Sequence, residues 1–163
     1  MKTIEELRKE AETAEQEASE AGQALREAEE RAELEARIRN AQARASAAKI
    51  AVYWQRWQPI AEAKRWRLGR MALGSGDSYA EVFFRHASEE EIRNMPTTDL
   101  EARSWLASKV IWYPPAGDGA IDTKALMTWI DEYMVQWPAT WATLMDRVHS
   151  LSLQTAEIVR GKA

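Results

Sequence analysis

The apolar residues in the first third of the chain recur at alternating steps of three and four residues. From the amino terminus they are Ile4, Leu7, Ala11, Ala14, Ala18, Ala21, Leu25, Ala28 and Ala32. This spacing is typical of the heptad seam of a helix that packs against another helix. After Ala32 the alternation resumes on a shifted stripe, where a local change in winding is expected. That stripe comprises Leu34, Ile38, Ala41, Ala45, Ala48 and Val52.

Strong helix formers fill the positions between the seam residues, and no proline occurs before Pro59. The pattern predicts a helical arm over residues 1–52, in which about 50 residues would reach roughly 75 Å. Alanine layers bury little apolar area, and Gly22 weakens the middle of the helix, so a free dimer of the arm alone would be weak. Alanine also permits close approach of a second helix, from the same chain, a second copy or another protein. The predicted contact residues on the arm are Leu7, Ala14, Ala18 and Leu25.

The remainder of the chain contains all the large aromatic side chains. Eight Trp, four Tyr and two Phe occur among the 163 residues, and all of them lie from Tyr53 onward. The core must therefore be built by residues 53–163. We expect an all-α protein, in which a long N-terminal Ala-rich, coiled-coil-like helix over 1–52 precedes a compact Trp-rich bundle of about four to six shorter helices over 53–163.

Capping residues and glycines divide residues 71–163 into further predicted helices, and we expect no strand. Asp77 or Ser78 can cap a helix that contains the apolar run ending at Phe84. Two capping boxes are predicted, one for a short helix before Pro96 and one for a helix that continues to Trp112. They are formed by Ser88 with Glu91 and by Thr98 with Glu101. Two later helices are predicted to begin at Asp122 or Thr123 and after Pro138.

A basic, aromatic segment at residues 53–70 forms the junction between arm and bundle. The formal charge is −3 over residues 1–50, +4 over 51–70 and −5 over 71–163, within a total of −4. Basic groups beside aromatic rings suit single-stranded nucleic acid, through phosphate neutralisation and base stacking. The alternatives are an acidic protein partner, or tryptophans that anchor the core beneath arginines paired with acidic residues. The candidate contact residues here are Trp54, Arg56, Trp57, Arg65, Trp66, Arg67 and Arg70.

The absence of cysteine excludes a disulfide framework, a thiolate zinc site and a cysteine nucleophile. The first residues lack the apolar stretch of a signal peptide, and no window approaches the roughly 18 consecutive apolar residues of a membrane span. We therefore expect a cytoplasmic protein without membrane contact.

Three short motifs suggest chemistry. Gly76-Asp77-Ser78 with Asp146-Arg147-Val148-His149 resembles two signature blocks of the GDS-type (SGNH) serine hydrolases. The resemblance implies a Ser78 nucleophile with His149 as its base and Asp146 as the group that orients the base, but the family's oxyanion-hole asparagine block has no counterpart in this chain. Residues 118–122 are similar to the second half of an EF-hand loop, whose other ligand positions hold no oxygen side chains. Asp146 and His149 form half of a di-metal bundle motif whose second half is missing.

These observations favour a non-enzymatic protein–protein interaction or assembly module that uses the arm and the aromatic-rich domain, without cofactor or metal. Its expected partner is another protein, a second copy of itself, or both. An accessory or inhibitor protein, of the kind that phages use against host defence, fits the same composition. The alternatives are nucleic-acid binding through residues 53–70 and, more remotely, a serine hydrolase that uses Ser78 and His149.

Overall fold

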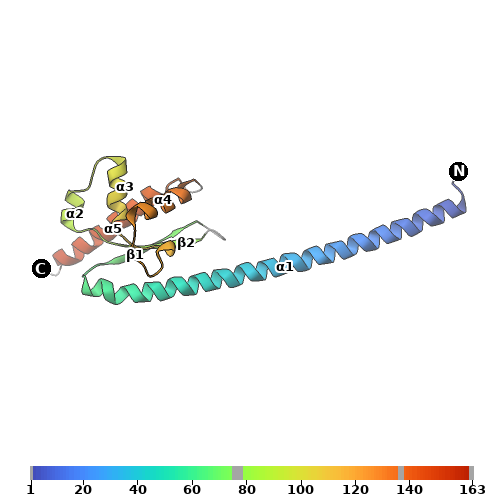
Figure 1. The fold of residues 1–163 in the computed structure, drawn as a ribbon, viewed down its shortest axis with the longest axis horizontal. Helices are drawn as coiled ribbons and strands as arrows, with labels where there is room; N and C mark the ends of the chain where they lie inside the picture. The colour runs from blue at the N-terminus through green and yellow to red at the C-terminus, as the bar shows by residue number, and fades with distance from the viewer. Residues whose placement is uncertain (1, 75–78, 136–137, 162–163) are drawn as a thin grey trace. The chain divides into compact units, whose positions relative to one another are not determined.

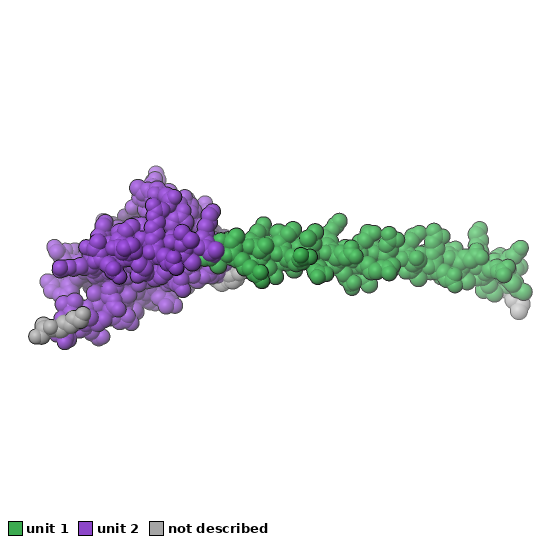
Figure 2. Space-filling model, turned by 90° about the horizontal axis from the view of Figure 1, so that it is seen from below, with its two compact units in different colours: residues 1–47 green, residues 48–163 purple. Residues whose placement is uncertain are grey.

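The computed structural model describes residues 2–74, 79–135 and 138–161. The chain divides into two compact units, residues 1–47 and residues 48–163, which are coloured separately in Figure 2. Helix α1 supplies the described first unit from Ile4 onward and the beginning of the second. Within the described ranges, no helix has both the length and the apolar character needed to cross a membrane.

Helix α1 runs from Ile4 to Ala63, which confirms the long N-terminal helix and extends it past the expected end. Thr3 and Glu6 close its amino terminus as a capping box, in which Thr3 N donates to the Glu6 carboxylate at 2.8 Å and Glu6 N donates to the Thr3 hydroxyl at 3.3 Å. Pro59, which the sequence marks as a point where the helix either breaks or kinks, lies inside α1, so the helix does not break there. The buried side chain of Ala61 packs the last turn in the second unit, and such tertiary packing offsets the cost of an internal proline.

The carboxyl end of α1 is closed by a Schellman motif. Trp66 N donates to Ala61 O at 2.8 Å, and Arg65 N donates to Glu62 O at 3.1 Å. Arg65 has a φ of 55°, in the left-handed region that this motif requires and that glycine usually occupies. The chain reverses there and enters the first strand.

A three-stranded antiparallel sheet follows, with strand order β1-β2-β3. Strand β1 is Leu68–Leu73, β2 is Ala80–Arg85 and β3 is Val110–Trp112. Strands β1 and β2 are paired from Leu68 opposite Arg85 to Leu73 opposite Ala80. An irregularity between Phe83 and Phe84 shifts the pairing with β3.

The expected all-α fold is therefore wrong, and the second unit is α+β. The apolar run at Val82, Phe83 and Phe84 had suggested a helix, and Val110 to Trp112 had suggested the end of another. In the structure these residues are buried in strands covered on both sides, so they lack the alternation of a half-exposed strand. Residues 77 and 78, the expected cap of the first of these helices, lie outside the described residues.

Four shorter α-helices and one 3-10 turn complete the described residues. They are α2 (Glu89–Arg93), α3 (Asp99–Ala107), η2 (Pro114–Ala116), α4 (Thr123–Met134) and α5 (Thr140–Gly161). The capping box of Ser88 and Glu91 is confirmed, as is Asp122 as the N-cap of α4. At α3, however, the Thr98 side chain forms no capping bond to the backbone, and its hydroxyl donates instead to the Glu101 carboxylate at 2.6 Å.

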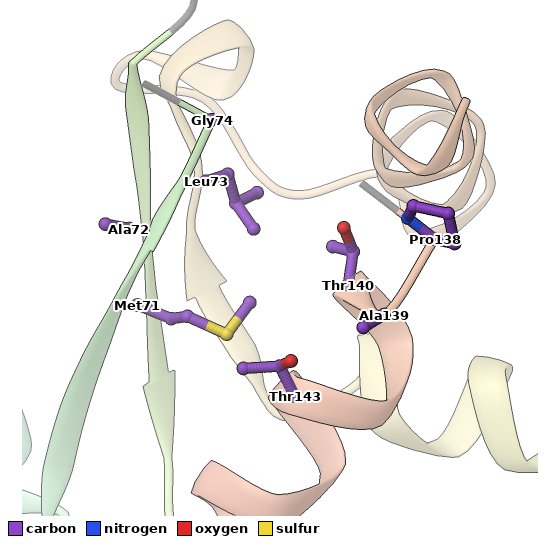
Figure 3. Close-up of a pocket in the computed structure, with 8 residues that line it drawn as sticks. All are labelled: Met71, Ala72, Leu73, Gly74, Pro138, Ala139, Thr140 and Thr143. Atoms are coloured by element: carbon purple, nitrogen blue, oxygen red, sulfur yellow. The ribbon is translucent and has the colours of Figure 1, made fainter. Parts of the chain in front are cut away.

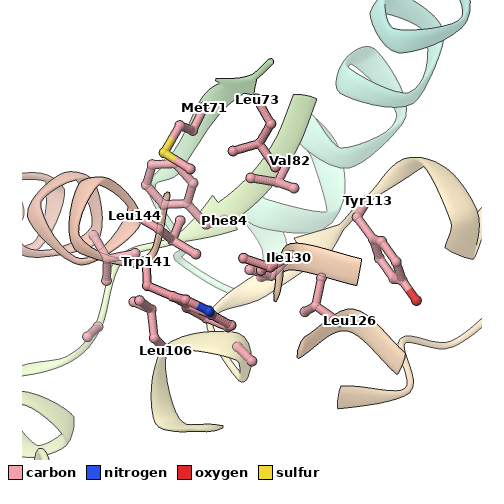
Figure 4. Packing of buried hydrophobic residues seen from close by; sticks show 14 residues of the cluster. Met71, Leu73, Val82, Phe84, Leu106, Tyr113, Leu126, Ile130, Trp141 and Leu144 are labelled. Carbon is pink, nitrogen blue, oxygen red and sulfur yellow. The ribbon is translucent and has the colours of Figure 1, made fainter. Parts of the chain in front are cut away.

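Helices lie on both sides of the sheet (Figure 1), and each face of the sheet buries an apolar cluster of its own. Helices α3, α4 and α5 cover one face, where Phe84, Leu126, Ile130 and Leu144 are almost fully buried (Figure 4). Residues 50–57 of α1 cover the other face. The cluster there contains buried Ile50, Phe83, Ile111 and Trp112, with Tyr53, Trp54, Trp57, Trp66 and Leu68 packed around them.

Candidate assembly surface

The heptad seam on residues 4–47 lies on the surface of the first unit. Ile4 is 87% exposed, Leu7 53% and Leu25 61%. On the shifted stripe, Leu34 and Ile38 are exposed as well. The predicted contact residues Ala14 and Ala18 share this exposure. A stripe of apolar side chains with helical period is therefore accessible along the whole arm.

The charges beside this seam are divided by sign along the helix. Residues 1–20 contain three basic and seven acidic side chains, a net charge of −4, whereas residues 31–50 contain five basic and two acidic side chains, a net charge of +3. The described members of both groups lie at exposed positions. One helix thus presents an acidic half and a basic half. The net charge of −3 over residues 1–50 does not reveal this division.

Where α1 enters the second unit it has two apolar sides. Ile50, Tyr53, Trp54 and Trp57 pack on the sheet. Tyr53 stacks on Trp112, with ring centroids 4.7 Å apart, and Trp54 meets the ring of Phe83 edge-on at 5.0 Å. Val52, the last residue of the shifted stripe, is 64% exposed. At about 100° per residue, Val52 lies roughly 200° around the helix from Ile50.

The basic side chains of residues 53–70 lie close to these aromatic rings. The Arg70 guanidinium is 5.5 Å from the ring centroid of Trp54. Trp66 has cations near its ring, Lys64 at 4.5 Å and Arg85 at 5.4 Å. The predicted contact residues Trp54, Trp57 and Trp66 therefore take part in the packing of their own unit.

The other predicted basic residues have contacts within the second unit. Arg56 forms an ion pair with Asp118. Arg65 forms the turn that ends α1, and Arg67 is bonded through its backbone to His86. In that exchange Arg67 N donates to His86 Nδ1 at 3.0 Å, and His86 N donates to Arg67 O at 3.0 Å. Burial, reinforced by the charge of Arg85, lowers the pKa of His86, which favours a neutral, structural histidine.

An ionic cluster of Arg85, Glu91 and Lys109 joins β2, α2 and the residue before β3. Arg85 donates to both oxygens of the Glu91 carboxylate, at 2.6 and 2.9 Å. Lys109 is only 3% exposed and lies with Nζ 4.8 Å from the centroid of Trp105. The hydrogen bonds from Arg85 hold the pKa of Glu91 well below its ordinary value, and the bonds from Lys109 and Ser88 N act in the same direction against the opposing effect of burial. Both cations are paired with the one Glu91 carboxylate, which leaves the cluster with a net charge of +1, and these contacts within the unit indicate a structural role.

Two shallow pockets of the second unit offer little chemistry. One of about 280 Å³ lies between β1 and the start of α5 and is lined by side chains such as Met71, Leu73 and Thr143, none of its lining residues being ionisable (Figure 3). The other, of about 310 Å³, is lined by Tyr53, Trp57 and residues 117–120, with the Arg56–Asp118 pair at its edge.

The structure describes only the second of the two sequence blocks that resemble a serine hydrolase, and it therefore shows no catalytic site there. Ser78 lies outside the described residues, as do Gly76 and Asp77. His149 and Asp146 are exposed on α5. In the part of the chain that the structure describes, no three His, Asp or Glu side chains form a group that could hold a metal ion.

Comparison with protein-family models, with curated proteins and with solved structures finds no match to this chain. The exposed seam and its charges are therefore the features of the chain from which we infer a function. Sequence reasoning had identified the seam but had not chosen the charged residues that flank it. Their signal was available in the sequence, as the change in sign between the two halves of the arm.

Proposed function

We propose that this chain is a non-enzymatic assembly module that docks through the seam of α1 onto another protein helix. The observation that carries the proposal is that the periodically spaced apolar residues Ile4, Leu7, Leu25, Leu34 and Ile38 are all exposed. Single apolar residues on a surface need no explanation, but a stripe in heptad register matches the way in which one helix packs on another. Burial of that stripe would supply the free energy of docking, at about 25 cal/mol per Å² of apolar surface.

Residues 53–70 support nucleic-acid binding less well. The stacking that single-stranded nucleic acid requires needs free aromatic faces. Trp54 packs against Phe83 and lies near Arg70, while Trp66 lies near two cations. If this segment does bind nucleic acid, the affinity must fall steeply with salt, and Arg65→Ala with Arg67→Ala must flatten that dependence.

Site-specific photo-crosslinking in the producing cells tests the proposed function. The crosslinker p-benzoylphenylalanine replaces Leu25 on the seam or, as a matched control, Gln23, which is two residues away on the opposite side of the helix. We expect discrete protein adducts from position 25 and none from position 23. The adducts should disappear when Leu7→Glu and Ile38→Glu are added. Absence of any adduct at position 25, including one with a second copy, would end the proposal.

A further inference from the structure

We propose that the helix which docks on this seam is α1 of a second copy of the chain, running antiparallel. This inference rests on the proposed function and adds the identity, direction and register of the partner. It is carried by two independent features of the arm, the sizes of the seam residues and the signs of the charges beside them.

The first feature is the match between large and small seam residues. When residue i of one helix faces residue 52 − i of the other, the seam of the first half meets the shifted stripe of the second half in five successive layers. The layers are Ile4 with Ala48, Leu7 with Ala45, Ala11 with Ala41, Ala14 with Ile38, and Ala18 with Leu34. Four of the five therefore place one large side chain opposite an alanine, and the two-fold axis repeats all five. A parallel, in-register pair would instead place alanine on alanine in the four layers from Ala11 to Ala21.

The second feature is the charge at the positions that flank these layers. In the antiparallel register Glu10 lies beside Arg44 of the other copy, and Glu17 lies beside Arg37. The two-fold axis makes four such opposite-charge contacts. On the other flank Arg8 faces neutral Gln42, and the like-charge contact of Glu15 with Glu35, which the two-fold axis makes twice, opposes the pairing. Attraction outweighs repulsion on this count.

A parallel pair reverses this balance. Its flanking contacts run between each residue and the one five positions later in the partner, which brings Glu10 to Glu15 and Arg44 to Lys49. Both contacts join like charges. The net charges of −4 on residues 1–20 and +3 on residues 31–50 also favour the antiparallel pair over the parallel one. Only antiparallel copies bring these two segments together.

The residues required for this pairing are accessible. Glu10, Glu17, Arg37 and Arg44 are exposed, although Glu10 forms an ion pair with Lys2 that would have to be exchanged. Ala48, the last residue of the five layers, lies on the same side of α1 as exposed Val52, away from the side that packs on the sheet. The seam can therefore be occupied without displacing Tyr53 or Trp54 from the sheet.

Sedimentation equilibrium of the full-length chain tests the inference through a charge exchange. The variant Glu10→Lys/Glu17→Lys and the variant Arg37→Glu/Arg44→Glu should each self-associate about tenfold more weakly or worse. An equimolar mixture of the two should dimerise again, because all four contacts then join opposite charges. One chain with all four substitutions should also recover. The matched control Glu12→Lys/Glu20→Lys, with two reversals away from the seam, should associate like the wild type.

Direction is read out separately by engineered cysteines, which is straightforward because the chain has none of its own. Ala11→Cys in one copy should form a disulfide with Ala41→Cys in another, whereas Ala11→Cys alone should not link to itself. A wild-type chain that stays monomeric, a charge mixture that fails to recover, or self-linkage at position 11 would each overturn the antiparallel dimer. If the crosslinker at position 25 nevertheless captured a different protein, the assembly function would stand and the partner assignment alone would fail.

Discussion

Lys109 Nζ donates a 2.6 Å hydrogen bond to Glu91 Oε1, and the lysine is buried while it does so. The same oxygen accepts a bond of equal length from Arg85. The carboxylate is thus the shared partner of two cations, one of which has almost no access to water. Removal of the carboxylate would leave a buried charge uncompensated, which costs far more than the loss of an exposed ion pair.

Glu91→Gln is therefore expected to lower the free energy of unfolding by about 3 kcal/mol. Chemical denaturation followed by tryptophan fluorescence measures this change. Adding Lys109→Met should recover part of the loss, because the uncompensated charge is removed with it. Arg56→Ala is a control for an exposed ion pair and should cost less than about 1 kcal/mol. A loss in Glu91→Gln as small as that of the control would show that the cluster is not structural.

The same cluster predicts acid sensitivity. The pKa of Glu91 is lowered in the folded chain, so the unfolded chain takes up the proton more readily as the pH falls. The stabilisation is fully present above the ordinary glutamate pKa of about 4.3 and is lost progressively below it. The wild type should lose stability more steeply below that pH than Glu91→Gln does. Denaturant unfolding curves of both proteins, recorded from neutral pH to below the glutamate pKa, test this prediction. Free energies of unfolding that fall in parallel with pH would contradict it.

Arg65 occupies a left-handed position where a side chain is a disadvantage. Arg65→Gly should raise the free energy of unfolding by about 1 kcal/mol, because glycine adopts this conformation without the steric cost. Arg65→Ala is the matched control, since it removes the same guanidinium but keeps the Cβ, and it should bring no gain. If both variants changed stability equally, the effect would belong to the side chain rather than to the backbone of the Schellman motif.

Replacement of glycine by alanine should have opposite effects in the two units. A Cβ at Gly69 would lie 2.4 Å from Cζ of Phe84, whose buried ring has little room to move, so Gly69→Ala should cost about 1–3 kcal/mol. A Cβ at Gly22 meets no atom within 4 Å, and Gly22→Ala should make the arm more helical, by about 1 kcal/mol. Circular dichroism measures the helix content of the arm, and tryptophan fluorescence measures the unfolding of the second unit, which contains all the tryptophans. If both variants were less stable than the wild type, the predicted opposite effects in the two units would be contradicted.

The sequence predicted the helices well where local chemistry determines them. The N-terminal helix, the Ser88–Glu91 box and the Asp122 cap depend on residues within a turn or two of one another, and the structure confirms all three. The continuation of α1 past Pro59 depends on packing against residues far along the chain, which local propensity does not report. Local propensity also does not report the left-handed conformation of Arg65, because glycine usually occupies such a position.

The strands were missed for a related reason. Met71 and Leu73 in β1 do alternate with more exposed residues, but the run is short and begins directly after a helix. Phe83 faces α1 while Val82 and Phe84 face the opposite cluster, so β2 is apolar on both sides. A buried strand of that length resembles a segment of buried helix when it is judged by hydrophobicity alone.

The alanine layers of α1 have a consequence for regulation. Only one side chain in most of the proposed layers is large, and the central residues 22–30, with a net charge of −2, would face the same segment of the other copy across the two-fold axis. On the proposed pairing, both features favour weak, reversible association over permanent union. The fraction of paired arms would then rise and fall with the abundance of the protein, and a change in expression would itself act as the switch.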